Sequence, residues 1–105
     1  MKAFTVAAVQ IAPVPGPLTT ESVKANLANA ADWVTRCVET SGAELVVLPE
    51  SVTTGFTPGV GPEELWDLVT DLPGPVVEPL QETARRLGAH VVVGTYARGG
   101  ERGVV

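Results

Sequence analysis

Short aliphatic runs and one long amphipathic repeat dominate the first half of the chain. Residues 5–11 are apolar and rich in β-branched side chains and are followed closely by Pro13, which predicts a first strand. Further on, apolar residues recur at intervals of four, three, four and four, the spacing of one helical face: Val23, Leu27, Ala30, Val34 and Val38. Gly42 can adopt the left-handed backbone conformation that ends a helix. Three hydroxyl residues are candidates for the cap at the start of this helix: Thr19, Thr20 and Ser22.

The second half of the pattern predicts another strand, two helices and a third strand. Residues 45–48 are aliphatic without polar alternation, as expected for a strand in a sheet covered on both faces. Residues 62–70 begin with proline and two acids, and residues 76–87 carry an apolar side that ends at Gly88, so both segments are predicted helices. Residues 91–96 form the last predicted strand. The order β-α-β-α-α-β predicts an α/β fold with a mainly parallel sheet and right-handed crossovers.

The end of the sequence predicts an interrupted element. Residues 98–103 are typical of a turn, and the apolar pair at 104–105 resembles the opening of a strand. A strand needs its remaining residues to pair its backbone and bury its apolar face. We therefore expect residues 1–105 to be the first part of a larger domain, prone to association when isolated.

Composition and charge exclude several classes of function. The chain has 105 residues, 45% of them hydrophobic, and a net charge of −5 from 12 acidic and 7 basic residues. No basic stripe is present to hold a phosphate backbone, so we expect no nucleic-acid partner. The longest aliphatic runs have four residues, against about 20 for a membrane helix, so we expect no membrane partner. The single cysteine, Cys37, cannot form an intramolecular disulfide, which favours a cytoplasmic location.

Glu50 is the leading candidate for chemistry. It follows the predicted buried strand at 45–48 and opens the loop at 51–56. Ligands of open parallel sheets bind beyond the carboxyl ends of the strands, and apolar neighbours there can raise the pKa of a carboxyl toward that of a general base. From its position alone, a solvated loop acid or a local cap is the commoner explanation.

The other reactive side chains are better explained as structural. Cys37 lies beside the apolar face of the long predicted helix, where a free cysteine acts as a small hydrophobe. His90 begins a strand, and Lys24 fits a solvated helix surface. One histidine and one distant cysteine do not make a metal site, and the glycine-rich segments lack the Lys-Ser/Thr ending of a phosphate loop. We therefore expect neither a metal nor a cofactor.

Four ordered segments together resemble the nitrilase superfamily of carbon-nitrogen hydrolases. These are Val6-Ala-Ala-Val-Gln10, Gly42-Ala-Glu-Leu-Val-Val-Leu-Pro-Glu50, Thr54-Gly-Phe56 and Leu87-Gly-Ala-His-Val-Val-Val-Gly-Thr95. The resemblance covers the whole chain and the N-terminal portion of the family's domain. It implies an α-β-β-α sandwich and a Glu-Lys-Cys catalytic set. In this family a cysteine thiolate attacks an amide, nitrile or carbamoyl carbon, a glutamate acts as general base, and a lysine stabilises the tetrahedral intermediate.

Only Glu50 matches this catalytic set. The family's lysine and cysteine lie downstream of the segment that begins after Tyr96, whereas Lys2, Lys24 and Cys37 all precede the glutamate. The resemblance thus predicts that residues 1–105 are the N-terminal part of a single hydrolase domain and are inactive alone.

The remaining expectations concern the substrate and the partners. The resemblance implies a small-molecule amide or nitrile substrate, and we expect a homo-oligomer for the complete protein. Thr54, Gly55 and Phe56 occupy the place of loop residues beside the family's pocket, and Phe56 stands where tyrosine is frequent. Two alternatives stay open: a non-catalytic binding or assembly module that completes another chain's sheet, and a relative that transfers an acyl group to an amine.

Overall fold

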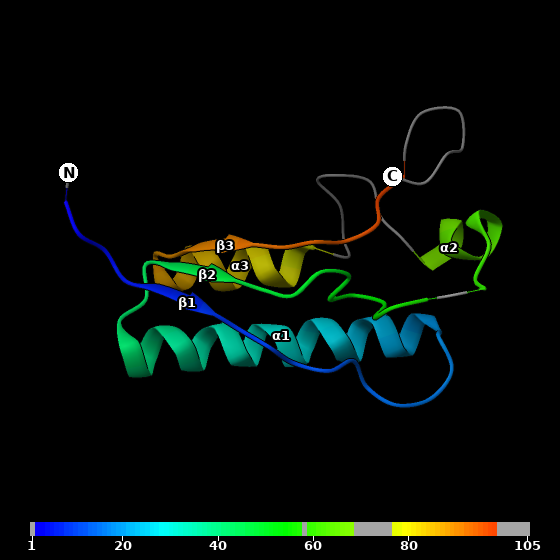
Figure 1. Cartoon of the computed structure of the whole chain (residues 1–105), viewed down its shortest axis with the longest axis horizontal. Coiled ribbons are helices and arrows are strands. Elements are labelled where there is room, and N and C mark those ends of the chain that lie inside the picture. The colour runs from blue at the N-terminus through cyan, green and yellow to red at the C-terminus, as the bar shows by residue number, and fades with distance from the viewer. Residues whose placement is uncertain (1, 58, 69–76, 99–105) are drawn as a thin grey trace.

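The computed structural model describes residues 2–57, 59–68 and 77–98, and its elements follow the predicted β-α-β-α-α-β order (Figure 1). The elements are β1 (Val6–Ala8), α1 (Thr20–Ser41), β2 (Leu45–Val47), α2 (Pro62–Leu68), α3 (Glu78–Leu87) and β3 (His90–Val92). The strands are shorter than predicted, although backbone pairing extends past them: the amide of Val9 donates to the carbonyl oxygen of Val47 at 2.9 Å. The predicted helix ends at 69–70 and 76 and the strand opening at 104–105 lie outside the described residues.

Helix α1 begins and ends where its sequence predicts. Thr19 is the N-cap, and its hydroxyl accepts a hydrogen bond from the Ser22 amide at 3.1 Å. The Ser22 hydroxyl accepts in turn from the Thr19 amide at 2.8 Å, so two amides left free by the helix start are satisfied. Gly42 ends the helix with φ 70° and donates its amide to Val38. Of the three candidate caps, the structure therefore selects Thr19, and the predicted glycine stop is confirmed.

The three strands form one parallel sheet in the order β1-β2-β3. Ala7, Val46 and Val91 lie side by side in this register. The predicted parallel sheet is confirmed, and parallel pairing brings the carboxyl ends of all three strands to one edge.

Helices α1 and α3 together cover one face of the sheet. Helices α1 and α3 contact each other, α1 contacts β2 and α3 contacts β3 (Figure 1). Val46 is fully buried against them, whereas its neighbours Leu45 and Val47 are only half-buried. On the outer strands, Val6 and Val92 are 51% and 49% exposed. The expectation of a sheet covered on both faces is therefore wrong for the described residues, which cover one face.

The hydrophobic core lies between this sheet face and the helices. It consists mainly of aliphatic side chains from α1 and the strand ends: Val9, Val23, Leu27, Ala30, Val34, Ala43, Val46, Leu48, Val52 and Leu80. Burying one such valine or leucine side chain stabilises a fold by about 1.5–3 kcal/mol. The predicted apolar stripe of α1 is confirmed, with Val38 packed at the edge of the core.

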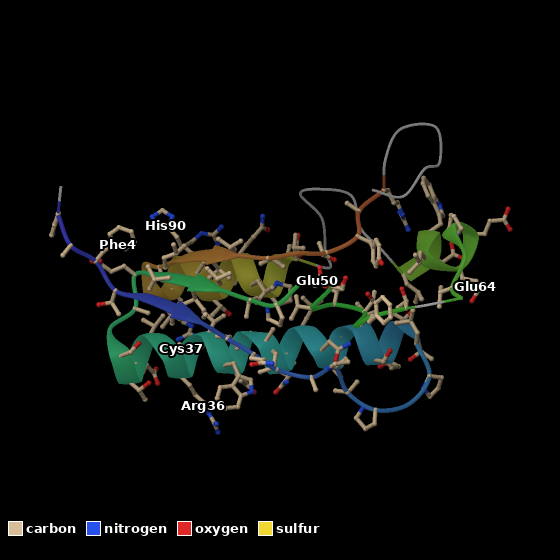
Figure 2. All side chains as sticks on the ribbon, in the orientation of Figure 1. Phe4, Arg36, Cys37, Glu50, Glu64 and His90 are labelled. Atoms are coloured by element: carbon tan, nitrogen blue, oxygen red, sulfur yellow. The ribbon has the colours of Figure 1, made fainter. Side chains whose placement is uncertain are left out.

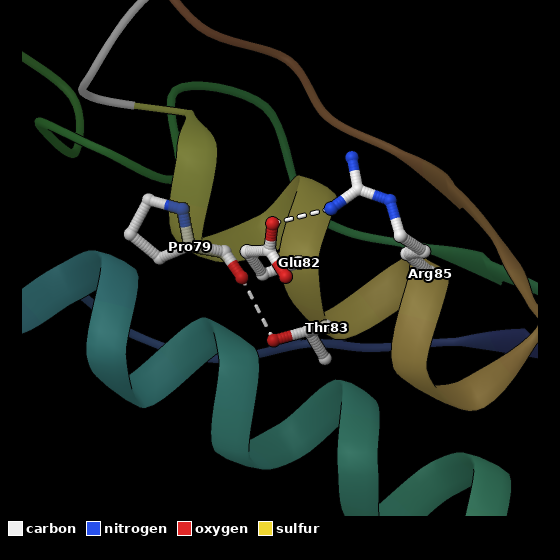
Figure 3. Close-up of polar contacts among 4 residues, drawn as sticks. All are labelled: Pro79, Glu82, Thr83 and Arg85. Atoms are coloured by element: carbon white, nitrogen blue, oxygen red, sulfur yellow. Dashed lines mark hydrogen bonds and ion pairs between the residues drawn. The ribbon is translucent and has the colours of Figure 1, made fainter.

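Helix α3 has polar interactions both at a buried side chain and at its surface (Figure 3). The buried Thr83 donates its hydroxyl to the carbonyl oxygen of Pro79 at 2.8 Å. Glu82 and Arg85 form an exposed ion pair one turn apart, an arrangement that adds little stability because water screens both charges. Gly88 ends the helix with φ 65°, as predicted.

Candidate functional site

Glu50 lies beyond the carboxyl end of β2, at the edge of the sheet where all three parallel strands end. Figure 2 shows it at the opposite end of the sheet from His90 and Phe4. The position agrees with the sequence-based prediction, because Pro49 and Glu50 follow directly on the end of the strand and its buried neighbour Leu48.

A pocket of about 210 Å³ lies beside Glu50. It is formed by the segment after β1, two side chains of α1 and the loop after β2: Ile11, Ala12, Pro13, Asn26, Asn29, Pro49, Glu50, Ser51, Val52, Gly55 and Phe56. Small-molecule sites usually have about 300–1,000 Å³, so this hollow can hold a small acyl group rather than a large ligand. A larger hollow of about 380 Å³ between α1, α2 and the start of α3 is lined by Lys24 but not by Glu50, Cys37 or His90.

The carboxylate of Glu50 is open to solvent. The residue is exposed, and within the described part of the chain its side chain makes no hydrogen bond or ion pair. The expected partial shielding by apolar neighbours is therefore not found there, because the loop carries Glu50 outward from Leu48 and Val52, which are buried. Both carboxylate oxygens are free to accept a proton or a hydrogen bond from a bound molecule.

The backbone around Glu50 is tightly constrained. Ser51 has φ 51°, the only non-glycine residue with positive φ among those the structure describes, and its carbonyl oxygen accepts from the amide of Gly55 at 2.7 Å. Such left-handed backbone costs a side-chain-bearing residue about 1–2 kcal/mol. It persists only where surrounding contacts enforce it, and functional sites are frequent places for it.

Gly94 supports this turn from the end of β3. The Val52 amide donates to the Gly94 carbonyl oxygen at 3.2 Å. A Cβ added to Gly94 would lie 3.2 Å from the Cα atom of Glu50, closer than ordinary carbon contacts. A glycine is thus needed here for the close approach of two backbones, a role that sequence reasoning missed.

Asn26 connects the two loops that border the pocket. Its Oδ1 accepts from the Val14 amide at 2.8 Å, and its Nδ2 donates to the carbonyl oxygen of Thr53 at 2.9 Å. Thr53 is also bonded through its hydroxyl to the hydroxyl of Thr95 at 2.7 Å. Sequence reasoning missed Asn26; the available signal was a polar residue on the apolar face of α1.

The loop residues Thr54, Gly55 and Phe56 differ in their relation to the pocket. Gly55 and Phe56 line it, and Phe56 is 89% exposed. Thr54 is buried and donates its hydroxyl to the Gly55 carbonyl oxygen at 3.0 Å, so it supports the turn and is absent from the pocket lining. Gly55 has φ 72°, and a Cβ there would lie 2.8 Å from Cγ of Pro13.

The other reactive residues lie away from Glu50. Cys37 is half-buried on α1 and packs against the core, and His90 is the exposed first residue of β3. Neither they nor Lys2 and Lys24 line the pocket beside Glu50. Among the described residues, no three His, Cys, Asp or Glu side chains come together in a way that could hold a metal ion. No helix in the described ranges has the length and apolar character needed to cross a membrane.

Comparison with family models gives a match that covers most of the chain. A family model described as "Carbon-nitrogen hydrolase" matches residues 5–105. A search of curated proteins finds no match to the chain.

Proposed function

We infer, because this chain belongs to the carbon-nitrogen hydrolase family over residues 5–105, that it supplies the general base of an enzyme that hydrolyses a non-peptide carbon-nitrogen bond. The base is Glu50. The observation that carries this proposal is an accessible carboxylate, free of protein partners among the described residues, beside a pocket at the carboxyl edge of a parallel sheet.

The proposed reaction uses a cysteine nucleophile and a cysteine thioester. Glu50 accepts the proton of the thiol as its sulfur attacks the carbon of an amide, nitrile or carbamoyl group. For an amide, the protonated carboxyl then gives its proton to the leaving amine as the thioester forms. Water attacks the thioester and gives a proton to Glu50. The carbon–sulfur bond then breaks, the acid is released, and Glu50 returns the proton to the sulfur, which regenerates the thiol. A lysine cation stabilises the negative oxygen that develops in both steps.

We propose that the thiol and the lysine come from sequence outside residues 1–105, which are the N-terminal part of one hydrolase domain. The position of Cys37 supports this proposal, because its side chain packs against the core rather than lining the pocket beside Glu50. The apolar sheet face around Val6 and Val92 supports it as well, since a face of this kind is suited to packing against more of the same domain. A preparation whose intact mass matches residues 1–105 should not hydrolyse short amides or nitriles, and measurable turnover by it would overturn this part of the proposal.

The role of Glu50 is tested by a pair of isosteric substitutions in the protein as its gene encodes it. Glu50→Gln removes the proton acceptor without changing side-chain size. Glu44→Gln is the control, because Glu44 is an exposed acid at the opposite end of β2. We expect ammonia release from short amides to fall about 10²–10⁴-fold in Glu50→Gln, the usual contribution of a general base, and to stay within about twofold in Glu44→Gln. Near-normal turnover by Glu50→Gln would remove Glu50 from this role.

The acyl acceptor is tested separately. Water gives a free acid, whereas an amine acceptor gives a new amide from the same thioester. We expect product analysis in the presence of hydroxylamine to show the free acid as the main product at low hydroxylamine concentration. Predominant hydroxamate under those conditions would favour the acyl-transferring alternative.

A further inference from the structure

Asn26 is a polar residue on the face of α1 that is otherwise apolar. It is 4% exposed and lies among Val23, Leu27 and Ala30, all of them in the core. A buried side-chain amide is costly unless its donor and acceptor are both paired. Both are paired, and neither partner belongs to the helix.

The two partners of Asn26 belong to the two chain segments that, with α1, form the pocket. Val14 belongs to the segment after β1, and Thr53 belongs to the loop after β2. One bond uses the amide as an acceptor and the other uses it as a donor. Aspartate, with ionised oxygens, cannot donate to Thr53, and leucine, which is similar in size, can make neither bond.

The loop held by Asn26 carries Glu50. Thr53 lies three residues after Glu50, within the turn in which the Ser51 carbonyl oxygen accepts from the amides of Thr54 and Gly55 at 3.2 and 2.7 Å. A displacement at Thr53 is therefore transmitted to Glu50 through a short and strongly bonded segment.

The end of β3 holds the same loop from a second direction. The Thr95 hydroxyl donates to the carbonyl oxygen of Tyr96 at 3.2 Å, which leaves the Thr53 hydroxyl as the donor in the 2.7 Å bond between the two threonines. Gly94 adds the bond to Val52. The turn is thus fixed between α1 and the segment that follows β3, with Asn26 as the only described side chain that bonds both pocket loops.

We propose that Asn26 is a positioning residue that fixes the carboxylate of Glu50 relative to the segment after β1, through its paired hydrogen bonds to Val14 and Thr53. This inference rests on the proposed function of Glu50. Asn26 does not transfer a proton; it sets the distance and direction from which Glu50 meets the reacting group. Misplacement of a catalytic group by about 1 Å can reduce the rate about 10²-fold.

The test compares Asn26→Ala and Asn26→Ser with Thr83→Val in the protein as its gene encodes it. Thr83 is a matched control because it is also a buried polar residue with a backbone partner, but its hydroxyl bonds to Pro79 within α3. Turnover is measured per folded molecule, at a temperature where circular dichroism shows every variant fully folded. We expect kcat to fall about 10–100-fold in the two Asn26 variants with KM within about threefold, and Thr83→Val to keep kcat within about twofold. Equal kcat values for the Asn26 variants and Thr83→Val would overturn the inference.

Amide hydrogen exchange gives a readout that does not depend on activity. Exchange in Asn26→Ser should accelerate in two segments, around 11–14 and 50–55, and stay unchanged in α3. Unchanged exchange in both segments would overturn the positioning role. Should Asn26→Ala fail to fold, Asn26→Ser and Thr95→Val serve in its place, since Thr95→Val removes the second tether of Thr53 and leaves the helix intact.

The same series separates this inference from the proposed function. Active Glu50→Gln overturns the base role of Glu50 and, with it, the assignment of Asn26 to that base. Inactive Glu50→Gln with unimpaired Asn26 variants overturns the inference alone. Loss of kcat in both, together with faster exchange in both loops, supports both.

Discussion

Gly94→Ala is a small change that acts directly on the backbone of Glu50. The added Cβ would lie 3.2 Å from Cα of Glu50 and 3.6 Å from the amide nitrogen of Ser51. Carbon atoms in good contact are about 3.5–4.0 Å apart, so the loop must retreat by about 0.3–0.8 Å. The backbone of Gly94 does not have the positive φ that disfavours other residues, and the contact is therefore the cause of any penalty.

The expected effects follow from this displacement. Overpacking costs about 1–3 kcal/mol, and the smaller conformational freedom of alanine in the unfolded chain returns about 0.4–1 kcal/mol, so the free energy of unfolding should fall by about 0–2.6 kcal/mol. If a 1 Å misplacement costs about 10²-fold in rate, a shift of about 0.3–0.8 Å costs about 4–40-fold. We expect kcat to fall by this factor while the protein stays folded.

The assay is ammonia release from a short amide by the protein as its gene encodes it, with Gly61→Ala as the control. A Cβ at Gly61 meets no atom within 4 Å, and its φ is not in the left-handed region either. Urea denaturation of both variants separates a loss of folded protein from a slower reaction. If Gly94→Ala and Gly61→Ala have the same kcat, the close approach of Gly94 does not set the position of Glu50.

Three further predictions concern stability, measured as the free energy of unfolding in urea. Ser51→Val should cost about 1–2 kcal/mol, because φ 51° suits a β-branched residue poorly, whereas Ser51→Asn should be nearly neutral; equal losses would argue against strain at this position. Val34→Ala should cost about 1.5–3 kcal/mol, because it removes two methyl groups from a fully buried side chain, and a loss near zero would mean that the core closes over the space. Thr19→Ala should cost about 1 kcal/mol through the lost N-cap, and an unchanged stability would show that water replaces the cap.

Local sequence patterns were sufficient to predict which helices and strands form and, for several of them, where they begin or end. Helix α1 is the clearest case, because its apolar spacing, the cap at Thr19 and the stop at Gly42 all lie within one continuous stretch. The covering of the sheet was not predictable in the same way. Only Val46 is fully buried, but Leu45 and Val47 on either side of it are aliphatic as well. The sequence therefore lacked the alternation of apolar and polar residues that marks a strand with one exposed face. The aliphatic run indicated a parallel strand correctly, but within the described residues only one of the two faces expected to be covered is covered.

Glu50 could be located from sequence because its signal is local: a buried strand, a proline and an acid in succession. Its supports come from distant segments. Asn26 bonds to a residue 27 positions away, and Thr53 bonds to one 42 positions away. The sequence did indicate that Asn26 needs such bonds, because a buried amide on an apolar helical face requires partners outside the helix. Which partners it finds depends on how the loops after β1 and β2 cross α1. That path follows from the sheet register and from the close contact of Gly55 with Pro13, so the supports of Glu50 are tertiary features even though its own position is a local one.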